Sequence, residues 1–232
     1  MKRGMRLAAA FAAALFLTAA RCDLPRDPRH TLDHVRSAKV LRVGAAEDRP
    51  FIVRDGEEAT GIEASLITRF ANEQGARVQW IWEPQEKEFQ ALAKFELDLM
   101  AGGIDAKTPW KKQAALTRPV AEIHEDLASV TGIVPAELEG HEVTIEQGDA
   151  IGETLEKKKA TVKRVAELKP GERLAAGSRA RLHELGYSGG HPLESHKLVL
   201  AAPPGENAFL EQLEKYLAAH HSEFAHAAGE TE

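Results

Sequence analysis

Residues 40–82 read VLRVGAAEDRPFIVRDGEEATGIEASLITRFANEQGARVQWIW and combine two kinds of hydrophobic period. The first residues form a short apolar run that ends at Gly44, which predicts a strand. Apolar residues at helical spacing then run from Ile62 to Phe70, and Gly75 is well placed to end that helix. Alternating apolar residues over 77–82 predict a second strand.

The same pattern continues to residue 103. Phe89 and Leu92 mark a second helix that ends near Lys94, and an apolar strand over 97–100 leads into the pair Gly102-Gly103. Strand, helix, strand, helix and strand in direct succession favour a parallel sheet with right-handed crossover connections.

A second, smaller α/β set is expected in the second half of the chain. Its predicted elements are a strand over 141–146, a helix over 149–158, a strand over 161–165, a helix over 173–185 and a strand from Lys197. An amphipathic helix that contains Phe209 and Leu217 comes last, and we expect the tail after Phe224 to be frayed. Between the two sets, Thr108-Pro109 predicts the start of a short helix.

The N-terminus has the composition of an export signal. Three basic residues precede the run LAAAFAAALFLTAA, which is shorter than the roughly 20 residues that span a bilayer as a helix. The first 21 residues hold four basic residues and no acidic one, so their removal leaves 26 basic residues against 36 acidic ones, a net charge of −10. An acidic protein of this kind is not expected to bind nucleic acid or anionic lipid.

Cys22 is the single cysteine and directly follows the hydrophobic run. In bacterial lipoproteins a cysteine at this place is acylated and becomes the new N-terminus. Arg21 and Ala19 fit the usual lipoprotein signal poorly, and ordinary cleavage after Ala20 is an alternative. We favour the lipid anchor, because a lone thiol in an exported protein has no other evident role.

Four segments of the chain occur in a familiar order. They are LRVGAAEDRPFIVRDGEEATGIEASLITRFANEQGARVQW, EFQALAKFELDLMAGGIDAKTPWKKQAALTRP, ELEGHEVTIEQGD and HKLVLAAPPGENAFLEQLEKYL. Together they resemble the extracellular solute-binding proteins of family 3, the amino-acid-type substrate-binding subunits of ABC importers, over about residues 40–224. CDLPRDP and PPGENAFL also resemble a branch of small lipoproteins whose second lobe is short.

The resemblance implies an α/β, two-lobed periplasmic-binding-protein fold, the type II or Venus-flytrap fold, with a shortened second lobe. The expected divisions are a signal peptide over 1–21, a tether over 22–39, lobe 1 over 40–126, lobe 2 over 127–195, a return to lobe 1 over 196–226 and a tail over 227–232. A small-molecule ligand would bind in the cleft between the lobes. The expected partner is an ABC permease in the membrane, and the protein is expected to be a periplasmic monomer without a cofactor.

The resemblance also assigns residues to the ligand. Phe51 matches an aromatic wall of the cleft, although burial in the core explains this residue equally well. Gly103 lies in the loop whose backbone holds the ligand's amino group in the family. Asp105 in the same loop could pair with a cationic group, or could be a solvated turn residue.

Two departures from the family pattern concern the ligand's carboxylate. Relatives that bind α-amino acids usually clamp that group with an arginine, and the matching place here is Trp110. Lys111 beside it is a flexible point charge and no substitute for a planar guanidinium. In the second lobe, Asp149 stands at a helix N-terminus that would otherwise meet the carboxylate, and its charge would repel an anion. We therefore expect a solute other than a standard α-amino acid.

The nature of that solute stays open at this point. Trp110 and Phe51 could form an aromatic face for a cation or an apolar group, or Trp110 could plug the cleft. Arg118 is the nearest remaining guanidinium for an anionic group, and a role on the surface suits it as well.

Catalytic and metal functions have little support in the sequence. HExxH, GxSxG, Walker and paired-cysteine patterns are absent, and the ten histidines lack the spacing of metal ligands. We therefore expect a binding protein with no catalytic residues and no metal. The alternatives are an envelope sensor or interaction protein on a degenerate solute-binding scaffold and, with less support, a periplasmic dehydratase-like enzyme.

Overall fold

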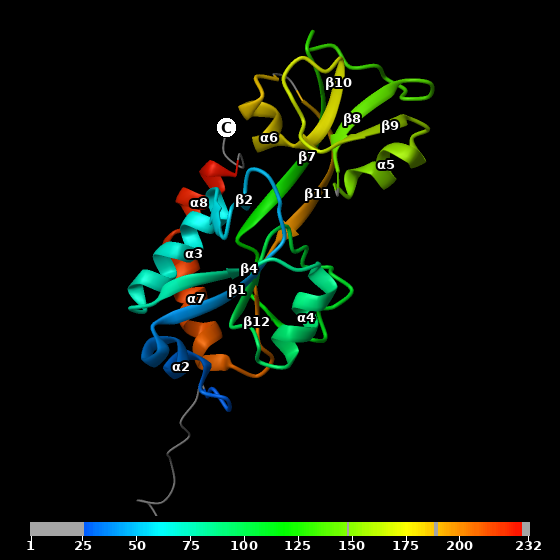
Figure 1. The fold of residues 1–232 in the computed structure, drawn as a ribbon. Coiled ribbons are helices and arrows are strands. Elements are labelled where there is room, and N and C mark those ends of the chain that lie inside the picture. Colours follow the sequence, from blue (N-terminus) through cyan, green and yellow to red (C-terminus); the bar gives the residue numbers. More distant parts are fainter. Residues whose placement is uncertain (1–25, 148, 188–189, 229–232) are drawn as a thin grey trace, which may run out of the picture.

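The computed structural model describes residues 26–147, 149–187 and 190–228, which form two α/β lobes (Figure 1). Each lobe is built on its own five-stranded sheet. A separate hairpin pairs β2 (Val53–Asp55) with β3 (Glu58–Thr60). The predicted two-lobed α/β architecture is confirmed.

The sheet of lobe 1 has the strand order β4-β1-β5-β12-β6. Its strands are β1 (Val40–Ala45), β4 (Arg77–Ile81), β5 (Leu99–Ala101), β6 (Ala115–Leu116) and β12 (Ala201–Ala202). β1 lies parallel to β4 and β5, as the strand-helix-strand pattern predicts, whereas β12 runs antiparallel to β5 and β6. Because β12 comes from the C-terminal part of the chain, this sheet is discontinuous in sequence.

Helices from both ends of the chain complete lobe 1 (Figure 1). They are α2 (Thr31–Ala38), α3 (Ile62–Glu73), α4 (Gln85–Ala93), α7 (Asn207–Ala219) and α8 (His221–Ala227). The ring centroid of Phe70 on α3 lies 6.0 Å from that of Phe209 and 5.4 Å from that of Tyr216, and both of these residues are on α7. The apolar face of the last long helix is therefore buried in the core of lobe 1, where it was expected.

The sheet of lobe 2 has the strand order β11-β7-β10-β8-β9. Its strands are β7 (Ala121–Ser129), β8 (Glu142–Glu146), β9 (Thr161–Val165), β10 (Leu174–Ser178) and β11 (His191–Leu198). The helices of this lobe are short, α5 (Ile151–Lys157) and α6 (Arg179–Glu184). β8 pairs in parallel with β9 and β10, and β7 is antiparallel to β10 and β11.

The antiparallel pair β7–β11 connects the two lobes (Figure 1). At one end Ala121 pairs with Leu198, next to lobe 1, and at the other end His191 pairs with Leu127 inside lobe 2. A register shift between Pro192 and Glu194 interrupts this ladder. Two crossing strands in contact form the kind of connection about which lobes can hinge.

Residues 26–38, placed in the tether by the sequence analysis, contact lobe 1. Asp27 Oδ1 accepts hydrogen bonds from the backbone N–H groups of Ala208 and Phe209 at 2.7 and 3.0 Å, and Glu206 accepts from Arg29 N and Thr31 N at 2.9 Å each. The carboxylate of Asp27 thus satisfies free donors at the start of α7. Among the residues described, no helix is long and apolar enough to cross a membrane.

Three local predictions are wrong. Thr108 does not cap a helix: residues 107–114 form turns, and the buried Oγ1 of Thr108 has no hydrogen-bond partner. Residues 174–178 are not helical but form β10, which is buried along its whole length in the middle of the sheet. The predicted fraying after Phe224 is wrong for residues 225–228, because α8 continues to Ala227, Ala225 and Ala228 are buried, and Phe224 packs on Phe51 with ring centroids 6.4 Å apart. Residues 229–232 lie outside the described part of the chain.

Candidate functional site

Asp48 follows β1 at the carboxyl edge of the first sheet, where parallel sheets bind ligands. The turn after β5 lies against it, since a Cβ atom placed on Gly103 would be 2.8 Å from Asp48 Oδ2. Gly102 and Gly103 both have positive φ, 99° and 67°, and a side chain on Gly102 would collide with the carbonyl oxygen of Ala46. Glycine at both places therefore permits the close approach of the two loops.

Glu63 lies behind these loops near the start of α3 and is 0% exposed. Its Oε2 accepts a hydrogen bond from Gly102 N at 3.1 Å, whereas its Oε1 is buried without a partner. Burial, and next the charge of Asp48, raise the pKa of Glu63 to about 8. This carboxyl is therefore mainly protonated at pH 7, and no ion pair formed among the described residues includes it.

Carboxylates of lobe 2 act on Asp48 from the opposite side. Burial is the main cause that raises the pKa of Asp48 to about 7, followed by the charges of Asp149 and Glu146. Asp149 precedes α5, and its Oδ1 accepts a hydrogen bond from Ile151 N at 3.0 Å. Burial also raises the pKa of Asp149 to about 6, against the effect of that hydrogen bond. Acidic groups of the two lobes thus repel one another across the junction.

Glu125 on β7 adds a buried carboxyl from the strands that link the lobes. It is 7% exposed, and its Oε2 has no hydrogen-bond partner. Burial raises its pKa well above the usual value, and the charges of Asp149 and Asp48 raise it further. In the ladder Glu125 lies opposite Glu194 of β11, and like charges in that position destabilise a strand pair.

We call Asp48, Glu63, Glu125 and Asp149 the acidic cluster. Of the ion pairs formed among the described residues, one reaches it: His196 Nδ1 lies 3.9 Å from Glu125 Oε1. Burial lowers the pKa of His196, so its ring is mainly neutral at pH 7. The cluster therefore brings together four carboxyls whose pKa values are all raised, so that their ionisation is unfavourable without a positive charge nearby.

Arg164 of lobe 2 donates to the carbonyl oxygen of Asp149 at 3.3 Å, pairs with Glu156, and by its charge partly offsets the burial that raises the pKa of Asp149. Two further arginines of lobe 2 are engaged with acids outside the cluster. Arg179 Nε donates to Asp126 Oδ2 at 2.9 Å, and Arg181 Nη2 donates to Glu146 Oε1 at 3.0 Å. Neither is an open guanidinium for an incoming carboxylate. Within the described part of the chain, no group of three or more His, Cys, Asp or Glu side chains is arranged to hold a metal ion.

The predicted aromatic residues are packed within lobe 1. Phe51 is 1% exposed and stacks on Phe224. Trp110 is half-buried and stacks on Phe89, with 5.5 Å between ring centroids. Both rings therefore pack as core residues do, which is the alternative considered for Phe51. A contact of either ring with a ligand stays a prediction.

The predicted polar residues lie in different places. Asp105 Oδ1 accepts a hydrogen bond from Lys107 N at 2.7 Å, which makes it a turn residue, and its charge also acts on His196. Asp149 belongs to the acidic cluster, and Gly103 adjoins it through Asp48. Cys22 is outside the described residues.

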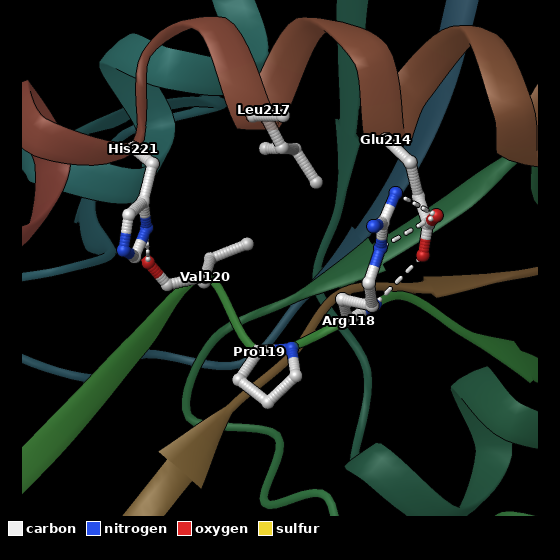
Figure 2. Close-up of a pocket in the computed structure, with 7 residues that line it drawn as sticks. Arg118, Pro119, Val120, Glu214, Leu217 and His221 are labelled. Atoms are coloured by element: carbon white, nitrogen blue, oxygen red, sulfur yellow. Dashed lines mark hydrogen bonds and ion pairs between the residues drawn. The ribbon is translucent and has the colours of Figure 1, made fainter.

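Among the described residues, Arg118 contacts Glu214 of α7 and makes no contact with the acidic cluster that would place it there. Its Nη2 is 2.8 Å from Glu214 Oε2, and its side chain is 77% exposed (Figure 2). Together with Pro119, Val120, Leu217, Ala218 and His221, this ion pair lines a pocket of about 230 Å³ on lobe 1. The pocket is smaller than the roughly 300–1,000 Å³ of typical small-molecule sites.

Sequence reasoning missed Asp48, Glu63 and Glu125. For two of these residues, the hydrophobic periodicity of the sequence contained a signal. Glu63 falls on the apolar face of α3, three and four residues before Leu66 and Ile67, and Glu125 alternates with Ile123 and Leu127 in a strand. A carboxylate at a position that its period assigns to the core is unusual and points to a special environment.

Comparisons with known proteins were made at the level of sequence and of fold. No family model matches the chain. Over 101 residues it is 33% identical to membrane-bound lytic murein transglycosylase F of Vibrio vulnificus, a match that covers 42% of this chain and 18% of that protein. The chain thus matches less than a fifth of the length of this relative.

Solved structures with the same fold match most of the chain. An ancestral cationic amino acid solute-binding protein has a TM-score of 0.71 at 17% identity, with 86% of this chain and 98% of the other covered. A putative ABC-transporter binding component of Wolinella succinogenes, complexed with lysine, has a TM-score of 0.64 at 16% identity and covers 83% and 93% of the two chains. These likenesses show that the chain has the two-lobed fold of periplasmic solute-binding proteins.

Proposed function

We propose that this protein is a solute-binding protein that captures a small molecule between its two lobes and delivers it to an ABC permease. One observation carries the proposal: two α/β lobes are joined by the β7–β11 pair, and polar side chains of both lobes meet beside it. Lobes connected in this way can close on a ligand by a hinge motion.

The chemistry of the junction supports binding rather than catalysis. Glu63 and Glu125 of the acidic cluster are buried and each has an oxygen without a hydrogen-bond partner, whereas Asp48 and Asp149 are half-buried. Buried groups of this kind are costly unless something satisfies them, and a bound solute would do so. The two solved neighbours described above are amino-acid-binding proteins, which agrees with solute capture.

A thermal-shift screen of the purified domain tests the proposal. The compounds are amino acids, amines, oligopeptides and organic acids. A ligand that binds the folded state raises the melting temperature by mass action, so at least one class is expected to stabilise the protein in proportion to the logarithm of its concentration. The absence of stabilisation by every class would contradict solute binding. If a solute binds but deletion of the permease leaves its uptake unchanged, the importer role is wrong and the sensor alternative replaces it.

We also propose that the protein is exported and that Cys22 is its acylated N-terminus. The basis is the hydrophobic run that ends directly before this single cysteine. Mass spectrometry of the membrane fraction should find residue 22 as the first residue, with its acyl chains. An unmodified Arg21-Cys22 terminus in the soluble periplasm would contradict the anchor.

A further inference from the structure

Four carboxyls from three parts of the fold converge at the junction of the lobes, and this convergence restricts the solute. Asp48 and Glu63 belong to lobe 1, Asp149 to lobe 2 and Glu125 to a connecting strand. We propose that the acidic cluster binds an aliphatic diamine, an organic dication without a carboxylate. This inference rests on the proposed function and names the chemical class of its solute.

The unpartnered oxygens are the observation that points to a ligand. Glu63 Oε1 and Glu125 Oε2 are both buried without a hydrogen-bond partner, although each carboxylate can accept several. Ammonium groups supply three N–H donors and a positive charge, which are the two things these carboxyls lack.

Two separated positive charges fit better than one. Glu63 lies behind Asp48 in lobe 1, whereas the charge of Asp149 acts on Asp48 from lobe 2, and the charges of Asp149 and Asp48 both act on Glu125 of the connecting strand. A single ammonium group on one side would leave the carboxyl groups on the other side without a positive charge. A chain with an ammonium at each end would compensate both, and would favour closure by bridging the lobes.

A compact metal ion fits poorly, because the described carboxyls are not grouped closely enough for three of them to hold one. An α-carboxylate on the solute fits poorly as well. Arg179 and Arg181 are engaged with Asp126 and Glu146, and Arg118 is engaged with Glu214. Arg164 is engaged with Glu156 and with the carbonyl oxygen of Asp149, and the carboxyl of Asp149 itself occupies the start of α5. A carboxylate placed between the lobes would therefore meet negative charge.

Isothermal titration calorimetry with three matched probes tests the inference. 1,5-Diaminopentane is lysine without its carboxylate, and pentylamine lacks one of the two ammonium groups. We expect diaminopentane to bind at least about 10-fold more tightly than L-lysine or pentylamine, since each charged hydrogen bond is worth about that factor or more. Magnesium chloride, as the metal probe, should give no saturable heat.

Conservative variants locate the site. Glu125→Gln and Asp48→Asn should each weaken diaminopentane binding about 10-fold or more. Glu137→Gln, which neutralises an exposed carboxylate in a loop of lobe 2, should leave it unchanged. Thermal melts of the free variants establish that they fold.

The outcomes separate this inference from the proposed function. Equal or tighter binding of L-lysine, or a diamine affinity that survives both cluster variants, overturns the inference. If diaminopentane does not bind while another class stabilises the protein in the thermal-shift screen, the inference fails and the solute-binding function stands. If no compound binds in either experiment, both fail.

Discussion

The two lobes are held together by different interactions. Lobe 1 buries four phenylalanine rings, of Phe51, Phe70, Phe209 and Phe224, in one core with helices of 12 and 13 residues. Residues 127–195 contain no Phe or Trp, and the helices α5 and α6 have seven and six residues. Arg179 and Arg181 bind there to Asp126 and Glu146. We infer that apolar burial dominates the stability of lobe 1, whereas charged networks have a larger share in lobe 2.

The largest expected loss of stability comes from an ion pair in lobe 1, which shows that charged interactions also stabilise the lobe in which apolar burial dominates. Asp98 is 2% exposed and accepts from Arg42 at its backbone N, Nε and Nη2, with distances of 2.9, 3.0 and 2.6 Å. Asp98→Ala should lower the free energy of unfolding by about 3–5 kcal/mol, because it leaves a partly buried guanidinium unpaired. Urea denaturation of the wild-type protein and the variant measures this difference in the free energy of unfolding. Glu139→Ala, which removes an exposed pair with Lys159, should cost less than about 1 kcal/mol, and equal losses would contradict the account.

A second prediction sharpens the apolar side of the comparison. Phe224→Ala should destabilise the protein by about 3 kcal/mol, because it opens a cavity beside Phe51 in the core of lobe 1. Ser222→Ala on the exposed side of the same helix is the control. Unchanged stability of the Phe224 variant would mean that α8 frays in solution.

The charged network of lobe 2 gives a smaller expected effect. Arg181 is 13% exposed and donates to Glu146, Glu184 and the carbonyl oxygen of Leu168. Arg181→Met keeps the aliphatic stem and should cost about 2 kcal/mol in chemical denaturation, from the loss of charged hydrogen bonds. The exposed Lys169→Met is the matched control. A stable Arg181 variant would show that apolar contacts alone hold lobe 2.

The junction of the lobes makes a prediction about pH. The pKa values of Asp48, Glu63 and Asp149 rise from 3.8, 4.5 and 3.8 to about 7, 8 and 6 on folding. The folded state therefore binds more protons than the unfolded state between about pH 4 and 8, and stability must fall as the pH rises through that range. Without ligand, the melting temperature should drop by a few degrees between pH 5 and 8. Asp48→Asn should flatten this slope, and a melting temperature that rises over this range would contradict the raised pKa values.

Much of the fold was predictable because the strands and helices of lobe 1 have a clear periodicity of hydrophobic residues. The run from Val40 to Gly102 contains β1, α3, β4, α4 and β5 where the pattern placed them. The errors have physical causes. LAAGS over 174–178 consists of small residues buried in the middle of a sheet, so propensity favoured a helix while tertiary contacts made a strand. α8 depends on burial of Phe224 beside Phe51, which no local signal reveals.

The candidate site was less predictable. Of the acidic cluster, Asp149 was named from the sequence because of its place before a helix, and its contact with a ligand stays a prediction. The convergence of Asp48, Glu63 and Glu125 depends on three elements that are far apart in sequence, and burial of their charges appears only when the lobes are assembled. Phe51 was assigned from a family match, which cannot show that Phe224 packs against it.

Proton release is the measurement that most directly tests whether the acidic cluster receives the solute. Calorimetric titrations with 1,5-diaminopentane at pH 7, in two buffers of different ionisation enthalpy, give the number of protons exchanged on binding. A dication favours ionised carboxyls, and groups with pKa values of about 6 to 8 are partly protonated at this pH, so the account predicts net proton release that falls in Asp48→Asn. Binding without proton exchange, proton uptake, or no binding at all would contradict it.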